Sequence, residues 1–236
     1  MLKVLIVEDN IFQNKQITNY ISQKNENLKV YYIAYTYKEA ISIIKKEIVD
    51  IIILDLNLPD ISGVEIIKFI ENNKLSKYIN SILVISSADH LFSKICKSQY
   101  VFSIINKPYS LHNIQENLNW ISEHIEEEKI MNKIYKELQF LHYNMSYNGT
   151  RYLADTIYEL FQNDINLNDN LKKNIYPLVA NKYRKSVNTI CGNIKQATKC
   201  MYLDCDEKII MQYFNCTNLY YPKLKEIIFT ILHKIS

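Results

Sequence analysis

Long apolar runs are absent from this chain of 236 residues. The longest, such as Ile51–Leu54, fall far short of the ~20 residues that a membrane-spanning helix needs, so we expect no membrane segment. The first ten residues already contain Glu8 and Asp9, which argues against a signal peptide. The five cysteines are an odd number and lie scattered, which indicates reduced thiols and a cytoplasmic location.

A large net charge is also absent, because 28 basic residues face 25 acidic ones. The position of the small excess matters more than its size. Residues 1–125 hold 13 basic and 13 acidic side chains, whereas residues 126–236 hold 15 and 12. Within the second part, Asn170–Leu203 carries seven Lys and Arg and no acid. Such a segment can bind phosphate, although solvated basic surfaces are also common.

Residues 1–125 alternate short apolar runs with segments of helical periodicity. The strand-like runs are Lys3–Val7, Leu28–Ile33, Val49–Leu54, Ser81–Ile85 and Val101–Ile105, and helices are expected at about 11–24, 36–46, 63–73, 90–98 and 109–125. Continuously apolar strands indicate a sheet that is covered on both faces. Five β–α units therefore predict a doubly wound, five-stranded parallel sheet, an α/β domain of the flavodoxin-like kind.

The remainder of the chain shows helical spacing and no strand run of comparable strength. Apolar stripes within 153–161, 187–201 and 227–232 predict an all-α domain at residues 142–236. No Gly or Pro lies between Pro108 and Gly149. We therefore expect residues 126–141 to be a helical linker that extends the last helix of the first domain.

Polar residues follow the apolar runs of the first domain, at the sheet edge where ligands bind in open α/β folds. Glu8 and Asp9 follow the first run, and Asp55 follows the third. Ser86 follows the fourth run and Lys107 the fifth. Three carboxylates at one edge call for a cation, and Mg²⁺ prefers such oxygen ligands together with phosphate. Lys107 and Ser86 would then contact phosphoryl oxygens.

Four separated motifs carry a resemblance. They are VEDN at residues 7–10, DLNLPDISG at Asp55–Gly63, the hydroxyl after the fourth run, and Lys107-Pro108. On these motifs, residues 1–125 resemble the receiver domain of bacterial two-component response regulators. The resemblance implies that Asp55 accepts a phosphoryl group from a histidine kinase or phosphotransfer protein. It also implies a Mg²⁺ site made by Glu8, Asp9, Asp55 and the backbone carbonyl of Asn57.

Two positions leave questions open. The aromatic residue that in this family commonly lies three positions before the lysine is Ile104 here, which puts the usual switch by a rotating ring in doubt. The hydroxyl is either Ser86 or Ser87, and the four apolar residues from Ile82 to Ile85 favour Ser86. A metal-dependent phosphatase could use the same acids, but the Asp55–Gly63 motif points to a receiver, so we expect no enzyme.

The basic segment has a helix-turn-helix pattern. Pro177 suits the first turn of a short helix that ends at Tyr183, and Ser186 is a good N-cap for a helix from Val187 to Met201. The turn would contact DNA phosphates and the polar face of the second helix would contact bases. The predicted DNA-binding residues are Lys182, Arg184, Lys185, Ser186, Asn188, Thr189, Gly192, Lys195, Gln196 and Lys199. A merely solvated polar face is the competing interpretation.

The segments GTRYLADTIYELF and LKKNIYPLVANKY, followed by a helix, give residues 138–205 a second resemblance. They resemble the effector domain of the sporulation-initiation response regulators of spore-forming Firmicutes. In that family the second helix presents arginines and a glutamate to bases, where this chain has Thr189, Cys191 and Gly192. Either the chain reads a different site, such as an A·T-rich one through Asn188, or specific DNA binding has been lost.

Together these features predict a phosphorylation-controlled response regulator that binds double-stranded DNA and regulates transcription, in sporulation or a related developmental or virulence programme. The resemblance implies Mg²⁺ as cofactor and a homodimer on phosphorylation. The alternative is a receiver-containing signalling or interaction protein that competes for the kinase, or pairs with a related regulator, without reading DNA.

Overall fold

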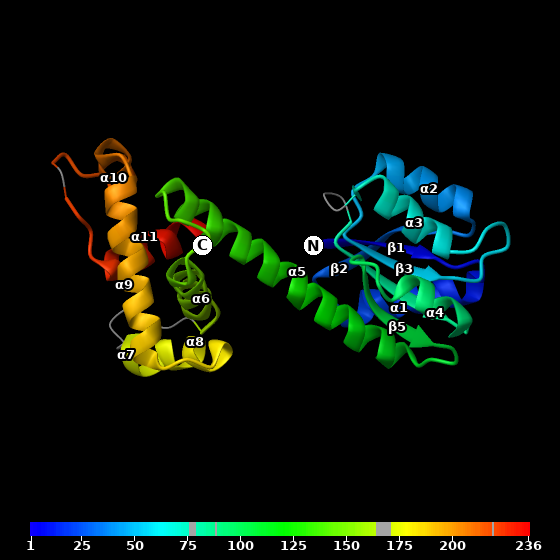
Figure 1. Cartoon of the computed structure of the whole chain (residues 1–236). Coiled ribbons are helices and arrows are strands. Elements are labelled where there is room, and N and C mark those ends of the chain that lie inside the picture. Colours follow the sequence, from blue (N-terminus) through cyan, green and yellow to red (C-terminus); the bar gives the residue numbers. More distant parts are fainter. Residues whose placement is uncertain (76–78, 88, 164–170, 219) are drawn as a thin grey trace. The chain divides into compact units, whose positions relative to one another are not determined.

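The computed structural model describes residues 1–75, 79–87, 89–163, 171–218 and 220–236 (Figure 1). The chain forms two compact units, Met1–Glu126 and Glu127–Ser236, and each is described by itself. None of the helices in these ranges combines the length and hydrophobicity that crossing a membrane requires.

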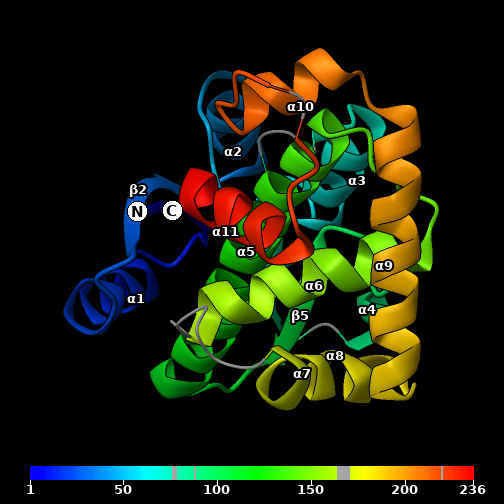
Figure 2. The same ribbon diagram turned by 90° about the vertical axis from the view of Figure 1, so that its left-hand side faces the viewer.

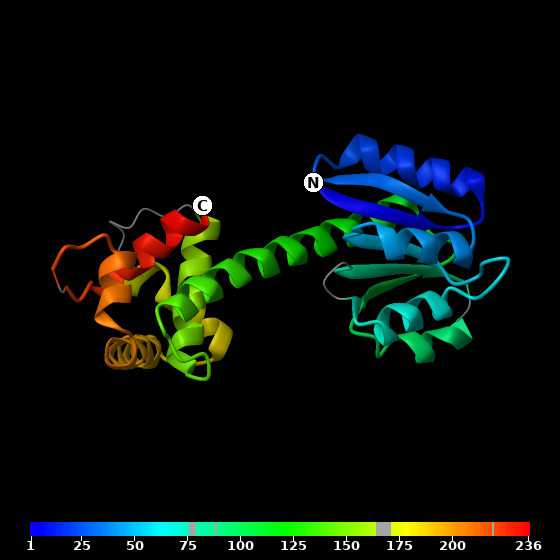
Figure 3. The ribbon, with the colours of Figure 1, turned by 90° about the horizontal axis from the view of Figure 1, so that it is seen from above.

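Unit 1 is built on a five-stranded parallel sheet with the strand order β2-β1-β3-β4-β5 (Figure 3). The strands are β1 (Leu2–Val7), β2 (Leu28–Ala34), β3 (Ile51–Asp55), β4 (Ser81–Ser86) and β5 (Val101–Asn106). The order reverses between β1 and β3, so the carboxyl ends of these two strands flank the crevice where ligands bind in doubly wound folds. The predicted fold class is confirmed.

Helices cover both faces of the sheet. They are α1 (Ile11–Lys24), α2 (Tyr37–Lys46), α3 (Val64–Asn72), α4 (Asp89–Ile95) and the first part of α5 (Leu111–Phe140). Ile17 of α1 and Leu118 of α5 are buried on one face, and Ile44 of α2 and Ile66 of α3 are buried on the other (Figure 1). Alternate residues of the buried strands serve both cores, which explains why the strands are continuously apolar.

Unit 2 contains only helices within its described residues (Figure 2). They are the second part of α5, α6 (Asn148–Asn163), α7 (Leu171–Asn174), α8 (Tyr176–Tyr183), α9 (Val187–Asp204), α10 (Glu207–Tyr213) and α11 (Leu224–Ile235). One core joins them, and Ile134, Leu138 and Leu141 are part of it. The stretch expected to be a linker lies almost entirely in α5, and its apolar residues pack into the core of unit 2.

The connection between α8 and α9 is a tight turn. Arg184 adopts a left-handed conformation with φ of 51°, and the backbone N–H of Lys185 donates to the carbonyl of Ala180 at 2.9 Å. Ser186 then caps α9, since its hydroxyl oxygen accepts a hydrogen bond from the Thr189 N–H at 3.1 Å. These local bonds end one helix and begin the next within three residues.

Close packing of α6 on α9 sets the position of α9 in this unit. Gly149 lies in the first turn of α6, where a Cβ atom would stand 2.0 Å from the carbonyl oxygen of Asn193. Only glycine allows two backbones to approach so closely. The sequence pattern predicted both helices, but it did not predict this contact.

Candidate functional site

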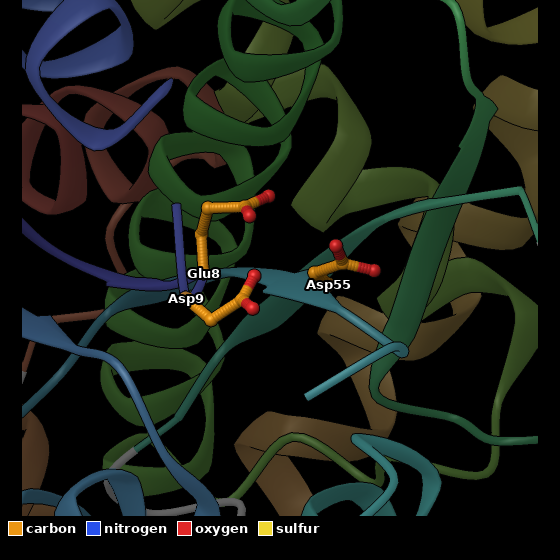
Figure 4. Close-up of side chains that lie close together, drawn as sticks. All are labelled: Glu8, Asp9 and Asp55. Carbon is orange, nitrogen blue, oxygen red and sulfur yellow. The ribbon is translucent and has the colours of Figure 1, made fainter. Parts of the chain in front are cut away.

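The carboxylates of Glu8, Asp9 and Asp55 meet at the carboxyl edge of the sheet of unit 1 (Figure 4). Glu8 and Asp9 directly follow β1, and Asp55 ends β3. One oxygen from each carboxylate lies within 4.8 Å of the other two. Glu8 and Asp55 are buried, whereas Asp9 is exposed. The structure thus brings together three of the predicted metal ligands.

Among the described residues, Lys107 supplies the one ammonium group that contacts these carboxylates. Its Nζ donates to Asp55 Oδ2 at 2.5 Å and to Glu8 Oε2 at 3.1 Å. Burial by itself would lower the pKa of Lys107, but the hydrogen bonds and charges of Asp55 and Glu8 raise it above its ordinary value. Lys107 therefore stays protonated and can neutralise a negative oxygen placed beside Asp55.

The charges at this edge do not balance. Burial raises the pKa of Glu8, although hydrogen bonds from Asn10 and Lys107 work in the opposite direction. When all three acids are ionised, a single ammonium leaves an excess of negative charge. The donor set of clustered carboxylate oxygens, one of them exposed to water, fits Mg²⁺, which keeps open positions for water and phosphate.

Backbone contacts hold the two buried acids in place. Asn14 Nδ2 donates to the carbonyl of Glu8 at 2.6 Å, and the Asn57 N–H donates to Asp55 Oδ1 at 2.9 Å. A Cβ atom on Gly63 would stand 2.4 Å from the carbonyl oxygen of Asp55. Neither Asn14 nor this role of Gly63 is predictable from the sequence pattern, because the contacts that define both roles exist only in the folded chain.

The two candidate hydroxyls, those of Ser86 and Ser87, differ in burial, but this difference does not decide which of them contacts a phosphoryl group. Ser86 is the last residue of β4 and is fully buried, whereas Ser87 is exposed and its Oγ accepts a hydrogen bond from Asn57 Nδ2 at 3.3 Å. Ile104 lies on β5, half-buried against the core that also contains residues of α2 and α3. The position where the family commonly has an aromatic residue is therefore taken by a half-buried aliphatic side chain.

All ten residues predicted to contact DNA are exposed in unit 2. Four lie in or beside the α8–α9 connection and six lie on α9, which runs along one side of the unit (Figure 2). Ile190, Ile194 and Ala197 are buried on the opposite side of α9. The apolar stripe thus leaves the predicted polar face open to a partner.

Lys182, one of the ten, also contacts a buried acid. Lys182 Nζ donates to Asp155 Oδ1 at 2.9 Å, and the hydroxyl of Tyr183 donates to Asp155 Oδ2 at 2.5 Å. Asp155 is buried, while the Lys182 side chain is 51% exposed. The bonds hold the last turn of α8 against α6, so Lys182 orients the turn as well as presenting charge. Nothing in the local sequence around Asp155 could have signalled this role.

Family models match both parts of the chain. The model of the response regulator receiver domain matches residues 4–119, and that of the sporulation initiation factor Spo0A C terminal matches residues 134–235. Among solved structures, the response regulatory domain of protein mrkE from Klebsiella pneumoniae is 22% identical, with a TM-score of 0.48 over 53% of this chain and 98% of its own. A CheY-like receiver domain protein from Methanospirillum hungatei JF-1 is 21% identical, with a TM-score of 0.46 over 54% and 98%.

Proposed function

This chain belongs to the response regulators in which a receiver domain is followed by a Spo0A C-terminal domain, and from that premise we propose how its two sites work. The combination makes it a phosphorylation-controlled transcription regulator. In our proposal, Asp55 accepts the phosphoryl group and the exposed face of α9 reads DNA. The observation that carries the proposal is the hydrogen-bonded Asp55–Lys107 pair beside two further acids at the edge of the sheet.

In the receiver, a carboxylate oxygen of Asp55 attacks the phosphorus of a phosphohistidine on a kinase or phosphotransfer protein. The P–O bond forms, the P–N bond breaks, and its electron pair returns to the imidazole. Lys107, now 2.5 Å from Asp55, would move its contact to a phosphoryl oxygen. Mg²⁺ held by Glu8, Asp9, Asp55 and the carbonyl of Asn57 would supply positive charge to the same oxygens.

Ser86 is our preferred partner for another phosphoryl oxygen, with Ser87 as the alternative. Moving either hydroxyl would pull on the end of β4, which pairs with β5 through Ser86 and Asn106. Ile104 lies two residues before Asn106 on β5. We propose that packing of this aliphatic side chain replaces ring rotation as the response, and that the phosphorylated form dimerises and places two α9 helices on two half-sites.

In unit 2, Arg184 and Lys185 at the turn are suited to phosphates, because both are exposed and lie just before the N-terminus of α9. Asn188 and Gln196 are suited to adenine, which an amide can recognise through two hydrogen bonds. Such contacts would favour an A·T-rich site. The genes controlled in this way would belong to sporulation or a related programme.

Phosphorylation is tested on the full chain with a small phosphodonor in the presence of Mg²⁺. We expect intact-mass spectrometry to show one added phosphoryl group in the wild type and none in Asp55→Asn. The matched control is Asp60→Asn, because Asp60 is an exposed acid in the same loop, where it accepts hydrogen bonds from the N–H groups of Tyr37 and Lys38. If the wild-type chain takes up no phosphoryl group, the proposed control by phosphorylation is excluded.

DNA reading is tested by enriching duplexes from a random library at fixed salt. A regulator should enrich a sequence above its salt-dependent, non-specific background. Lys195→Ala and Lys199→Ala should each lower the salt slope of binding by about one, whereas Lys225→Ala on α11 should not. If phosphorylation is normal but no sequence is enriched, the alternative holds, and the chain acts on the kinase or a related regulator without reading DNA.

A further inference from the structure

Glycine is rare in this protein, and each of its three positions can be given a structural test. A Cβ atom on Gly63 would stand 2.4 Å from the carbonyl oxygen of Asp55, and one on Gly149 would stand 2.0 Å from that of Asn193. Packing therefore requires both. Apart from its chain neighbours and the nearby backbone of α9 itself, a Cβ atom on Gly192 would meet nothing within 4 Å, so packing does not require glycine there.

Gly192 also has no conformational reason to be glycine. No glycine in the described chain has a positive φ, and Gly192 lies in the interior of the 18-residue helix α9. At an exposed interior position, glycine makes a helix less stable than alanine does. A larger helix-forming residue at this position would make α9 more stable, yet the sequence has glycine here.

The position of Gly192 on α9 supplies a reason. At about 100° per residue, Asn188 and Gln196 lie within ~40° of it on opposite sides, one turn before it and one turn after it. Lys195 and Lys199 belong to the same exposed face. Gly192 is thus the centre of the predicted DNA-reading face, with one amide at each end of a span of ~12 Å, or roughly three to four base-pair steps.

We propose that Gly192 is a specificity-determining residue, whose missing side chain lets α9 lie close to the floor of the major groove. The close approach leaves room for a thymine methyl group beside Gly192, and it brings Asn188 and Gln196 within reach of adenines on either side. The site read would have an A·T core without the guanine contacts that arginine makes. This inference rests on the proposed DNA-binding function and names the sequence class that it recognises.

The test is Gly192→Ala in the full, phosphorylated chain, measured on the duplex that the wild type enriches from a random library. We expect affinity for that duplex to fall about tenfold or more, comparable to a mismatched base pair. Non-specific affinity at low salt should stay unchanged, because every cation remains. The same substitution should raise the unfolding temperature of unit 2 by about 3–6 °C, since the helix gains an alanine.

The outcomes separate this inference from the proposed function. If the wild type enriches no sequence, the proposed function fails and this inference falls with it. If the wild type enriches a G·C-rich core, or if Gly192→Ala binds the enriched duplex as tightly as the wild type, the inference alone is overturned. A lowered unfolding temperature would mean that Gly192 serves the fold, and would also overturn it. Asn188→Ala and Gln196→Ala should each relax base preference at one end of the A·T core.

Discussion

Replacing Gly149 by alanine tests whether the contact between α6 and α9 positions α9, the helix proposed to contact DNA. The new Cβ atom would stand 2.0 Å from the Asn193 carbonyl oxygen, 2.6 Å from its carbon and 2.9 Å from Ala197 Cβ. Two of these three atoms are backbone, so no side-chain rotation can relieve the overlap. One helix must shift by about 1 Å or more, and overpacking of this kind costs about 1–3 kcal/mol.

Hydrogen exchange detected by mass spectrometry measures this cost in each unit separately. A loss of 1–3 kcal/mol corresponds to exchange about 5 to 150 times faster at the protected amides of α6 and α9. The peptides of β1 and β3 should exchange as in the wild type, because they belong to unit 1. Gly192→Ala is the matched control, since its Cβ atom meets nothing, and it should slow exchange in α9. Unchanged protection in Gly149→Ala would refute the reasoning.

Three further changes test the remaining contacts. Gly63→Ala should slow phosphoryl uptake at least several-fold, measured by intact mass over time. The new Cβ atom would stand 2.4 Å from the carbonyl oxygen of Asp55 and would therefore displace the backbone of the phosphoacceptor. An unchanged rate would show that the loop moves freely. Mg²⁺ at ten times its dissociation constant should stabilise the wild-type receiver against urea by about 1.4 kcal/mol. Asp9→Asn, which alters an exposed ligand, should abolish most of that gain in stability. Asp155→Ala should destabilise unit 2 by about 1–3 kcal/mol in urea, because it removes the acceptor of the Tyr183 hydroxyl; equal stability would mean that water replaces the carboxylate.

The sequence was sufficient to predict the order and kind of the elements, because burial on both faces makes every central strand continuously apolar. Ile51–Leu54 was recognisable as a strand for that reason, and it lies in β3. The acids were predictable because they come directly after such runs. The ends of elements were less certain: β3 begins at Ile51 and not at Val49, and α9 continues to Asp204, beyond the predicted end at Met201.

The site residues also divide into those whose positions the sequence pattern predicted and those whose roles stay predictions. The pattern put Glu8, Asp9, Asp55 and Lys107 at one edge, and the structure gives them distances. The choice between Ser86 and Ser87 stays a prediction, as do the contacts to DNA and the homodimer. The exposed face of α9 followed from helical periodicity alone, since a buried stripe at Ile190, Ile194 and Ala197 leaves the opposite side to solvent.

The sequence by itself determined features that are local or periodic. They are a neutral α/β domain with an acidic cluster at the carboxyl edge of its sheet, a positively charged helical segment, and the motifs by which both parts resemble response regulators. Tertiary structure decided the rest. Lys182 meets Asp155 across 27 positions of sequence, and Gly149 meets Asn193 across 44, so neither contact leaves a periodic trace. The three glycines look alike in the sequence. Only the packing around each of them shows that the fold requires two and leaves the third, Gly192, to be explained by a partner.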